Sequence, residues 1–291
     1  MKIIISGSLG NIGQHLTALL AKANHELVVI SSNADRKAAI EALGATAAIG
    51  SINNVDFLSE TFAGADALFA MTPPNMGGQN IIENTVNAGK AFAKAIENAN
   101  VPRVVMLSSI GADVEKGTGP IAGLHQIEKI YNELNTSVTF LRAGYFYTNH
   151  YNDIPLIKNA GIIGANFPAE TKIPYVHPQD IAVAAAEELQ KQTTGKNVRY
   201  IVSDFRSAAD TANLLGTAIG NPALPWVEFT DEQSLQGMIG AGLPEEMAHL
   251  YTEMGQGIRE GKIQTDFVDN NHQTEGKTKL EDFAQEFKSK F

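Results

Sequence analysis

The sequence contains no cysteine. This absence excludes a disulfide framework, catalysis by a thiolate and a metal site with cysteine ligands, and it suits a reducing compartment, so we expect a cytoplasmic location. The sequence also lacks an apolar run near the roughly 20 residues that a membrane-spanning helix needs. It shows no charged-then-apolar leader ahead of its first strand pattern. We therefore expect no membrane association.

Basic residues are fewer than acidic ones, with 22 Lys and Arg against 32 Asp and Glu and a net charge of −10. Such a balance disfavours binding to nucleic acid or to an anionic membrane, although it allows a local basic pocket. The hydrophobic content of 44% and charged content of 19% are ordinary for a globular protein. A chain of 291 residues is long enough for a nucleotide-binding domain that carries a smaller one.

The segment Lys2–Gly13 combines a short apolar run with three evenly spaced glycines. The run predicts a buried parallel strand that ends near Ser6. Gly7 allows a tight turn, Gly10 lets the backbone approach a pyrophosphate, and Gly13 lets the following helix pack closely on the strand. The N-terminus of that helix favours an anion through its unpaired N–H groups and its dipole. The segment therefore predicts a dinucleotide site.

Strand and helix patterns alternate through the first half of the chain, which predicts a parallel sheet with helices on both faces. After the first strand, the strand patterns lie at 27–30, 45–49, 66–70, 103–107 and 138–141. The helix patterns lie at 11–23, 34–43, 78–98 and 120–134. Ligands of such sheets bind beyond the carboxyl ends of the strands. We therefore expect one shared rim formed by residues 6–7, 31–33, 71–74, 108–111 and 142–146.

After about residue 150 the pattern becomes mostly helical, with one more strand at 198–202. The later helix patterns lie at 180–192, 206–219, 231–240, 244–260 and 279–290. The sequence thus predicts an α/β protein. Its main part is a doubly wound parallel sheet of Rossmann type over residues 1–150, which binds NAD(P) and takes late sheet elements from 173–203. A smaller, largely helical lobe over residues 151–291 would close over the rim.

The residues after the strand at 27–30 bear on which nicotinamide cofactor fits. An NAD site usually has Asp or Glu there to hold the ribose hydroxyls, whereas this chain has small polar residues at 31–33. These leave space, and Arg36 with Lys37 could meet the 2′-phosphate of NADP, although Asp35 would repel it. The alternative is that Arg36 and Lys37 are solvated helix charges. We favour NADP and keep NAD as the alternative.

The spacing G-x-x-G-x-x-G resembles that of the short-chain dehydrogenase/reductase superfamily, whose usual acid is a Tyr followed four residues later by a Lys. None of the seven tyrosines here has Lys at that spacing. In the helix where the pair should fall, His125 is followed by Lys129 on the same face, and His125 could donate a proton near neutral pH. The alternative is that Glu128 and its charged neighbours form an ordinary exposed helix face.

Three further groups follow predicted strands. Thr72 and Pro73 follow the strand pattern at 66–70, and the proline makes the chain rigid there. The pair either ends a loop or borders the cofactor. Ser108 stands where short-chain dehydrogenases place a catalytic hydroxyl. The aromatic run 145–147 could stack on a nicotinamide or wall an apolar substrate pocket, or it could seal the interface with the lobe as plain core. We expect pocket lining, with Tyr145 as a third catalytic candidate.

Taken in order, these motifs resemble the NmrA-like family of atypical short-chain dehydrogenase/reductases, and its bacterial quinone-reducing members most. The resemblance spans nearly the whole chain. It rests on GSLGNIG at 7–13, Thr-Pro-Pro at 72–74, LSSIGA at 107–112, His-x-x-Glu-Lys at 125–129, the run from Thr139 to Asn149, VHPQDIA at 176–182 and the segment 278–287.

The resemblance implies binding of NADP(H), or sometimes NAD(H), and a quinone-like acceptor; a homodimer is a further expectation. Two departures from the family pattern are Ser32, where Arg is common, and Gly50-Ser51, where Gly-Asp is common. The implied cofactor residues are Gly7, Ser8, Gly10, Asn11, Ile12 and Gly13 at the pyrophosphate, Ser32 and Asn33 at the adenosine ribose, Thr72 and Pro73 along the cofactor, and Gly144, Tyr145 and Phe146 at the nicotinamide.

Two functions compete on this basis. The protein is an oxidoreductase that passes a hydride from NAD(P)H to a small conjugated acceptor, or a non-catalytic redox sensor that binds the cofactor and acts through protein partners. The missing Tyr–Lys pair is compatible with both, because a quinone needs mainly an electrophile held at hydride distance. A nucleotide-sugar epimerase or dehydratase is disfavoured, since those reactions depend on the missing acid. We favour the oxidoreductase.

Overall fold

A seven-stranded parallel sheet forms the centre of the computed structural model, which describes residues 1–72 and 78–291. The strands run in the order β10-β6-β5-β4-β1-β2-β3, and every neighbouring pair is parallel. They are β1 (Lys2–Ile5), β2 (Glu26–Ser31), β3 (Thr46–Ile49), β4 (Ala67–Ala70), β5 (Arg103–Ser109), β6 (Ser137–Ala143) and β10 (Lys196–Ile201). This order confirms the predicted doubly wound sheet of Rossmann type, in which the winding reverses between β1 and β4.

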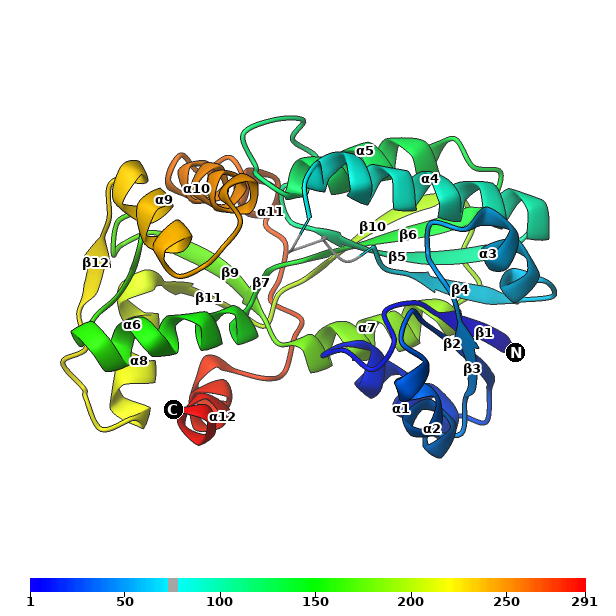
Figure 1. The fold of residues 1–291 in the computed structure, drawn as a ribbon, viewed down its shortest axis with the longest axis horizontal. Coiled ribbons are helices and arrows are strands. Elements are labelled where there is room, and N and C mark those ends of the chain that lie inside the picture. Colours follow the sequence, from blue (N-terminus) through cyan, green and yellow to red (C-terminus); the bar gives the residue numbers. More distant parts are fainter. Residues whose placement is uncertain (73–77) are drawn as a thin grey trace.

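Helices cover both faces of this sheet (Figure 1). On one face lie α1 (Gly13–Lys22), α2 (Lys37–Ala42) and α7 (Pro178–Gln190). On the other lie α3 (Val55–Phe62), α4 (Ile81–Ala99) and α5 (Ile121–Asn132). Side chains alternate along a strand, so Ile3 and Ile5 of β1 join the core under α1 and α7, while Ile4 joins the core under α4 and α5. The apolar run Ile3–Ile5 of β1 is explained by this burial on both sides.

The C-terminal lobe, here residues 151–291 apart from α7 and β10 of the sheet half, lies at one end of the central sheet (Figure 1). Its helices are α6 (Ile154–Ala160), α8 (Ala208–Ala218), α9 (Asp231–Gly240), α10 (Glu245–Arg259), α11 (Thr265–Asp269) and α12 (Leu280–Lys290). The predicted helical C-terminal region is thus confirmed, and a separate core joins its helices to the residues after β6. The division of the chain near residue 150 stays a prediction.

Two small sheets lie outside the central one and were not predicted. One has the order β11-β9-β7 and the other pairs β12 with β8. Their strands are β7 (Tyr145–Phe146), β8 (Ile163–Ala165), β9 (Lys172–Val176), β11 (Asp204–Ser207) and β12 (Trp226–Glu228). Strands this short show no usable alternation of apolar and polar residues. Of the late sheet elements expected from 173–203, β10 joins the central sheet, whereas the strand that begins at Lys172 belongs to a separate small sheet. Short 3-10 turns, η1 (Ala34–Arg36) and η2 (Tyr147–Asp153), complete the described elements.

Among the described helices, none combines the length and the apolar character that a bilayer crossing requires.

Candidate active site

The turn between β1 and α1, residues 6–13, has the backbone conformation that its glycines predict. Gly7 has φ +96° and Ser8 has φ +52°, so the chain is left-handed at both positions, and the Gly10 N–H donates to the Gly7 carbonyl at 3.3 Å. A Cβ atom on Gly13 would collide with the Ser8 carbonyl oxygen. Glycine at 13 is therefore what lets α1 begin so close to the turn.

Three features of this glycine turn fit a dinucleotide phosphate. The first turn of α1 has no side-chain cap. Its Gln14 N–H donates to the Gly10 carbonyl at 3.1 Å, and the N–H groups there that lack such a partner are available to an anion. A Cβ on Gly10 would meet only the Gly7 carbonyl, at 3.4 Å, which leaves the outer side open. Within the described part of the chain, the Ser8 and Thr72 hydroxyls are buried without a hydrogen-bond partner. Buried polar atoms are rarely unpaired, so these hydroxyls point to a polar ligand.

At the adenosine end of the rim, Asn33 is partly committed to the fold. Its side-chain oxygen accepts from the Asp35 N–H at 2.8 Å and caps η1. Ser32 and Arg36 are exposed beside it. Lys37 forms a 3.9 Å ion pair with Glu41, whereas Arg36 has none among the residues described. Arg36 is therefore the better placed of the two cations to meet a 2′-phosphate.

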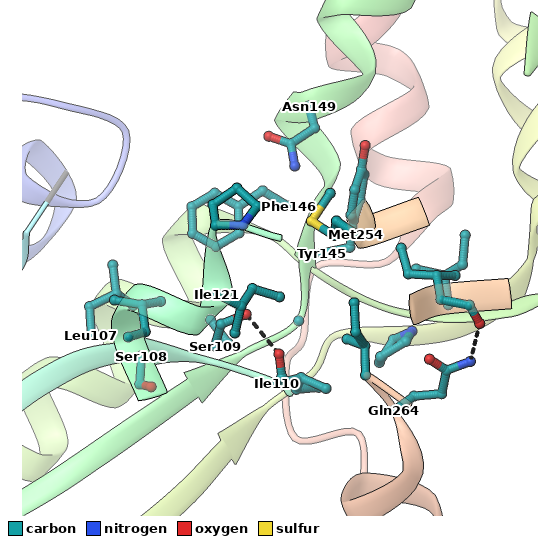
Figure 2. Close-up of a pocket in the computed structure, with 18 of the residues that line it drawn as sticks. Leu107, Ser108, Ser109, Ile110, Ile121, Tyr145, Phe146, Asn149, Met254 and Gln264 are labelled. Carbon is teal, nitrogen blue, oxygen red and sulfur yellow. Dashed lines mark hydrogen bonds between the residues drawn. The ribbon is translucent and has the colours of Figure 1, made fainter. Parts of the chain in front are cut away.

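A cavity of about 330 Å³ lies where the carboxyl ends of β5 and β6 face α10. Figure 2 shows Leu107 and Ser108 at one side of it and Gln264 at the opposite side. Most of the lining is apolar, and no charged side chain of the described residues contributes to it. The polar lining residues are Thr72, Thr85, Ser108, Ser109, Tyr145, Asn149, Tyr251 and Gln264. The site thus resembles a pocket for a small, uncharged, largely apolar molecule.

Several of the predicted site residues meet at this cavity. Thr72, Ser108 and the run Gly144–Phe146 line it. Gly144 is required because a Cβ there would collide with the Pro174 carbonyl oxygen of β9. Burial raises the pKa of the Tyr145 phenol well above its usual value, and nearby Asp153 adds to this rise. Pro73 lies outside the described residues.

His125 and Lys129 are not among the described residues that line the cavity. The His125 ring is buried, and its Nδ1 lies 2.7 Å from the Ala112 carbonyl oxygen. Lys129, one turn later, is exposed. The structure therefore does not bring this pair together with Tyr145.

Glu128 is buried, with only 6% of the residue exposed. The alternative that it lies on an ordinary exposed helix face is therefore wrong. Its carboxylate forms a two-pronged ion pair with Arg142 of β6, at 2.8 Å to Nη2 and 3.1 Å to Nε. Ser108 donates to the same carboxylate at 2.6 Å. Burial alone would lower the pKa of Arg142, but the hydrogen bonds and charge of Glu128 outweigh it and raise that pKa. The Ser108 proton thus points into the protein, toward Glu128.

The sequence did not predict that α10 forms one wall of the cavity. Tyr251, Met254 and Ile258 all line the cavity. Their spacing of three and four residues places them on one helix face, a signal that the sequence did contain. Nothing local in the sequence showed that this face meets the rim of the sheet.

Comparisons with known proteins show which family and which solved structures this chain is similar to. The model of the NmrA-like family matches residues 1–284. An NAD(P)H azoreductase from Xenophilus azovorans is 27% identical over 254 residues, which cover 87% of this chain and 85% of that protein. An NADPH-dependent quinone oxidoreductase from Escherichia coli, solved with NADPH, has a TM-score of 0.82 and 19% identity over 98% of this chain and 99% of its own. A triphenylmethane reductase from Citrobacter sp., solved with NADP(H), has a TM-score of 0.80 and 20% identity over 99% and 100%.

Proposed function

The chain belongs to the NmrA-like family, and from this premise we propose that it is an NAD(P)H-dependent oxidoreductase that reduces a quinone-like or other small conjugated acceptor. The observation that carries the proposal is the cavity at the rim, whose described lining carries no charged side chain. Met71, which packs against Gly7 of the glycine turn, and Thr72 help to line it. The relatives named as an azoreductase, a quinone oxidoreductase and a triphenylmethane reductase support it.

The cofactor would be held by the first turn of α1 and by the Ser8 and Thr72 hydroxyls, which fit its phosphates. Its reduced nicotinamide supplies a hydride when bound. Gly144–Phe146 would border that ring, because they lie at the carboxyl end of β6 and line the cavity. The protein's contribution is then to hold the acceptor at hydride distance and to exclude water.

We propose Tyr145, rather than His125, as the group that faces the acceptor. Tyr145 lines the cavity, and burial, which raises the pKa of its phenol, keeps it neutral, so that it can donate a hydrogen bond. His125 and Lys129 remain sequence candidates that the cavity does not include.

Replacing Tyr145 with Ala is expected to slow quinone reduction about tenfold, equivalent to roughly 1.4 kcal/mol, while cofactor affinity stays close to that of the wild type. The reason is that the substitution removes both a wall of the acceptor pocket and a hydroxyl, but no phosphate contact. Steady-state rates and a fluorescence titration of NADPH measure the two effects. Equal turnover by the variant and the wild type would contradict the proposal that Tyr145 contacts the acceptor.

Replacing Arg36 with Ala is expected to weaken NADPH binding about tenfold and to leave NADH binding unchanged, because only NADPH carries the 2′-phosphate. Lys37→Ala is the matched control, since Lys37 already pairs with Glu41. Parallel titrations of both cofactors provide the measurement. An equal loss for NADH and NADPH, or no loss for either, contradicts the assigned contact.

The remaining expectations accompany this proposal. We propose that the protein acts in the cytoplasm on a small-molecule acceptor, without nucleic acid, and we keep the homodimer as a prediction. The net charge of −10 and the absence of cysteine support these assignments.

A further inference from the structure

A second cavity, of about 390 Å³, lies on the surface of the C-terminal lobe next to the cavity at the rim. Two residues line both of them, Ile258 near the end of α10 and Gln264 directly before α11. The second cavity is open to solvent and is not part of the site described above. Ile258 and Gln264 therefore form the wall between a rim cavity for the acceptor and a surface cavity beside it.

The second cavity combines an apolar face with charges of both signs. Phe205 and Val268 contribute the apolar face, and Val268 is 42% exposed. Lys172 places its ammonium 5.9 Å from the centre of the Phe205 ring, and Asp269 contributes a carboxylate to the same cavity. The third charged residue, Arg259, already forms an ion pair at 2.9 Å. Since the charges oppose one another, the cavity fits a neutral apolar ring better than an ion.

The two residues of the wall differ in how firmly they are held. Ile258 is only 4% exposed, and its β-branched side chain is stiff in a helix. The amide of Gln264 makes one hydrogen bond to the described residues, from Nε2 to the Ile258 carbonyl oxygen at 3.1 Å, and its oxygen is buried without a partner. An unpaired buried oxygen is unfavourable. Turning the amide into the open second cavity would hydrate this oxygen at the loss of one neutral hydrogen bond, so the Gln264 side chain can move at small cost.

The backbone beside Gln264 is fixed, which confines such a movement to the side chain. The Ile263 N–H donates to the Gly257 carbonyl oxygen at 3.4 Å. A Cβ on Gly111 would lie only 3.1 Å from the Ile263 side chain, so this contact is close as well. Asp266 forms an ion pair with Arg142 of β6 at 3.4 Å. The wall can therefore open through one side chain while α10 and α11 stay in place.

The shape of the rim cavity directs the far end of an acceptor toward this wall. In the proposed function, the ring that accepts the hydride lies beside Gly144–Phe146, at the carboxyl end of β6. Figure 2 shows Gln264 on the opposite side of the cavity from Leu107 and Ser108. A substituent that extends away from the end of β5 therefore meets the Gln264 side chain.

We infer that the Gln264 side chain is a gate between the two cavities, and that the second cavity is a subsite for the far ring of an elongated acceptor. The inference rests on the proposed function and narrows its substrate class to neutral conjugated acceptors that carry an aryl substituent. When the gate opens, the reacting ring stays in the rim cavity and the second ring packs on Phe205 and Val268. Removal of that ring from water provides the additional affinity.

The first test compares menadione with its analogue in which a benzyl group replaces the methyl group, by equilibrium dialysis without cofactor. The wild type is expected to bind the benzyl compound about tenfold more tightly. Phe205→Ala should remove most of this preference by weakening the benzyl compound alone. Phe229→Ala is the matched control, because Phe229 is another half-buried phenylalanine of the lobe that lines neither cavity. A preference that Phe205→Ala leaves intact overturns the subsite.

The second test addresses the gate. Gln264→Phe places a rigid apolar side chain in the wall, which has no amide to turn toward water, and should weaken the benzyl compound about tenfold while menadione binds as before. Gln264→Ala leaves the wall open and should bind the benzyl compound at least as tightly as the wild type. An equal loss for both quinones in Gln264→Phe indicates a merely structural role, and a loss of the benzyl compound in Gln264→Ala indicates a direct contact. Either result overturns the gate.

Competition between the two quinones shows whether one ligand spans both cavities. The benzyl compound should displace menadione completely, because both compounds place their quinone ring in the rim cavity. Simultaneous binding would confine the benzyl compound to the second cavity and overturn the continuous site.

These measurements need no turnover, so they separate the inference from the proposed function. If the preference depends on Phe205 and Gln264 but neither quinone oxidises NADPH, the oxidoreductase is refuted and the two cavities stand as a binding site. If both quinones oxidise NADPH but the preference is independent of Phe205, the oxidoreductase stands and the subsite is refuted.

Discussion

Gly10→Asp is expected to abolish binding of both NADPH and NADH, with a loss of at least about 100-fold, or roughly 2.7 kcal/mol. The backbone at Gly10 has room for a Cβ, which would meet only the Gly7 carbonyl oxygen at 3.4 Å. The fold should therefore survive. The added carboxylate would lie where the glycine turn receives the pyrophosphate, and two negative charges at close range in a partly desolvated site repel strongly.

Gly10→Ala is the control for this prediction. It adds the Cβ without the charge and is expected to lose far less affinity than the Asp variant. Isothermal titration of both variants against both cofactors, with circular dichroism to confirm folding, separates the charge effect from the steric one. Unchanged affinity in the folded Asp variant would show that the dinucleotide binds elsewhere.

Glu128→Ala is expected to lower the free energy of unfolding by about 2–3 kcal/mol, because the buried Arg142 guanidinium loses its two-pronged partner and keeps only the longer 3.4 Å ion pairs with Asp113 and Asp266. Arg142 and Glu128 have side chains that are only 10% and 7% exposed. The loss should lower the melting temperature by roughly 5–10 °C for a chain of this size. Thermal and urea unfolding provide the measurement.

Lys37→Ala supplies the comparison, since its ion pair with Glu41 has side chains that are 62% and 52% exposed. Exposed pairs contribute about 0–1 kcal/mol. A double variant in which Met replaces both Glu128 and Arg142 should recover much of the lost stability, because it removes the poorly compensated guanidinium, while Asp113 and Asp266 are partly exposed and can be solvated. If Glu128→Ala unfolds at the same temperature as Lys37→Ala, the buried pair does not stabilise the fold.

The sheet and the glycine turn could be predicted because their signals are local. An apolar run such as Ile3–Ile5 must be buried on both faces. Gly7 has a positive φ that disfavours a side chain, and a Cβ on Gly13 would collide with the Ser8 carbonyl oxygen. The burial of Glu128 was not predictable in the same way. Its partner Arg142 lies 14 residues further on, on a different element, and only the folded sheet brings the two together.

The acceptor side of the site depended even more on tertiary structure. Tyr145 was identified because it directly follows a strand end on the rim. Tyr251 was not, because its helix reaches the rim through Glu246 and Glu253, which bind backbone groups more than 130 residues away. The apolar face of α10 was readable from its spacing, but the surface that it covers was not.

The most direct test of the central claim is stopped-flow absorbance of the reduced cofactor with purified protein and a panel of quinones. The oxidoreductase assignment predicts rapid oxidation of NADPH, faster than that of NADH, that requires a quinone. Tight binding of either cofactor without oxidation by any acceptor would contradict it and favour the redox sensor.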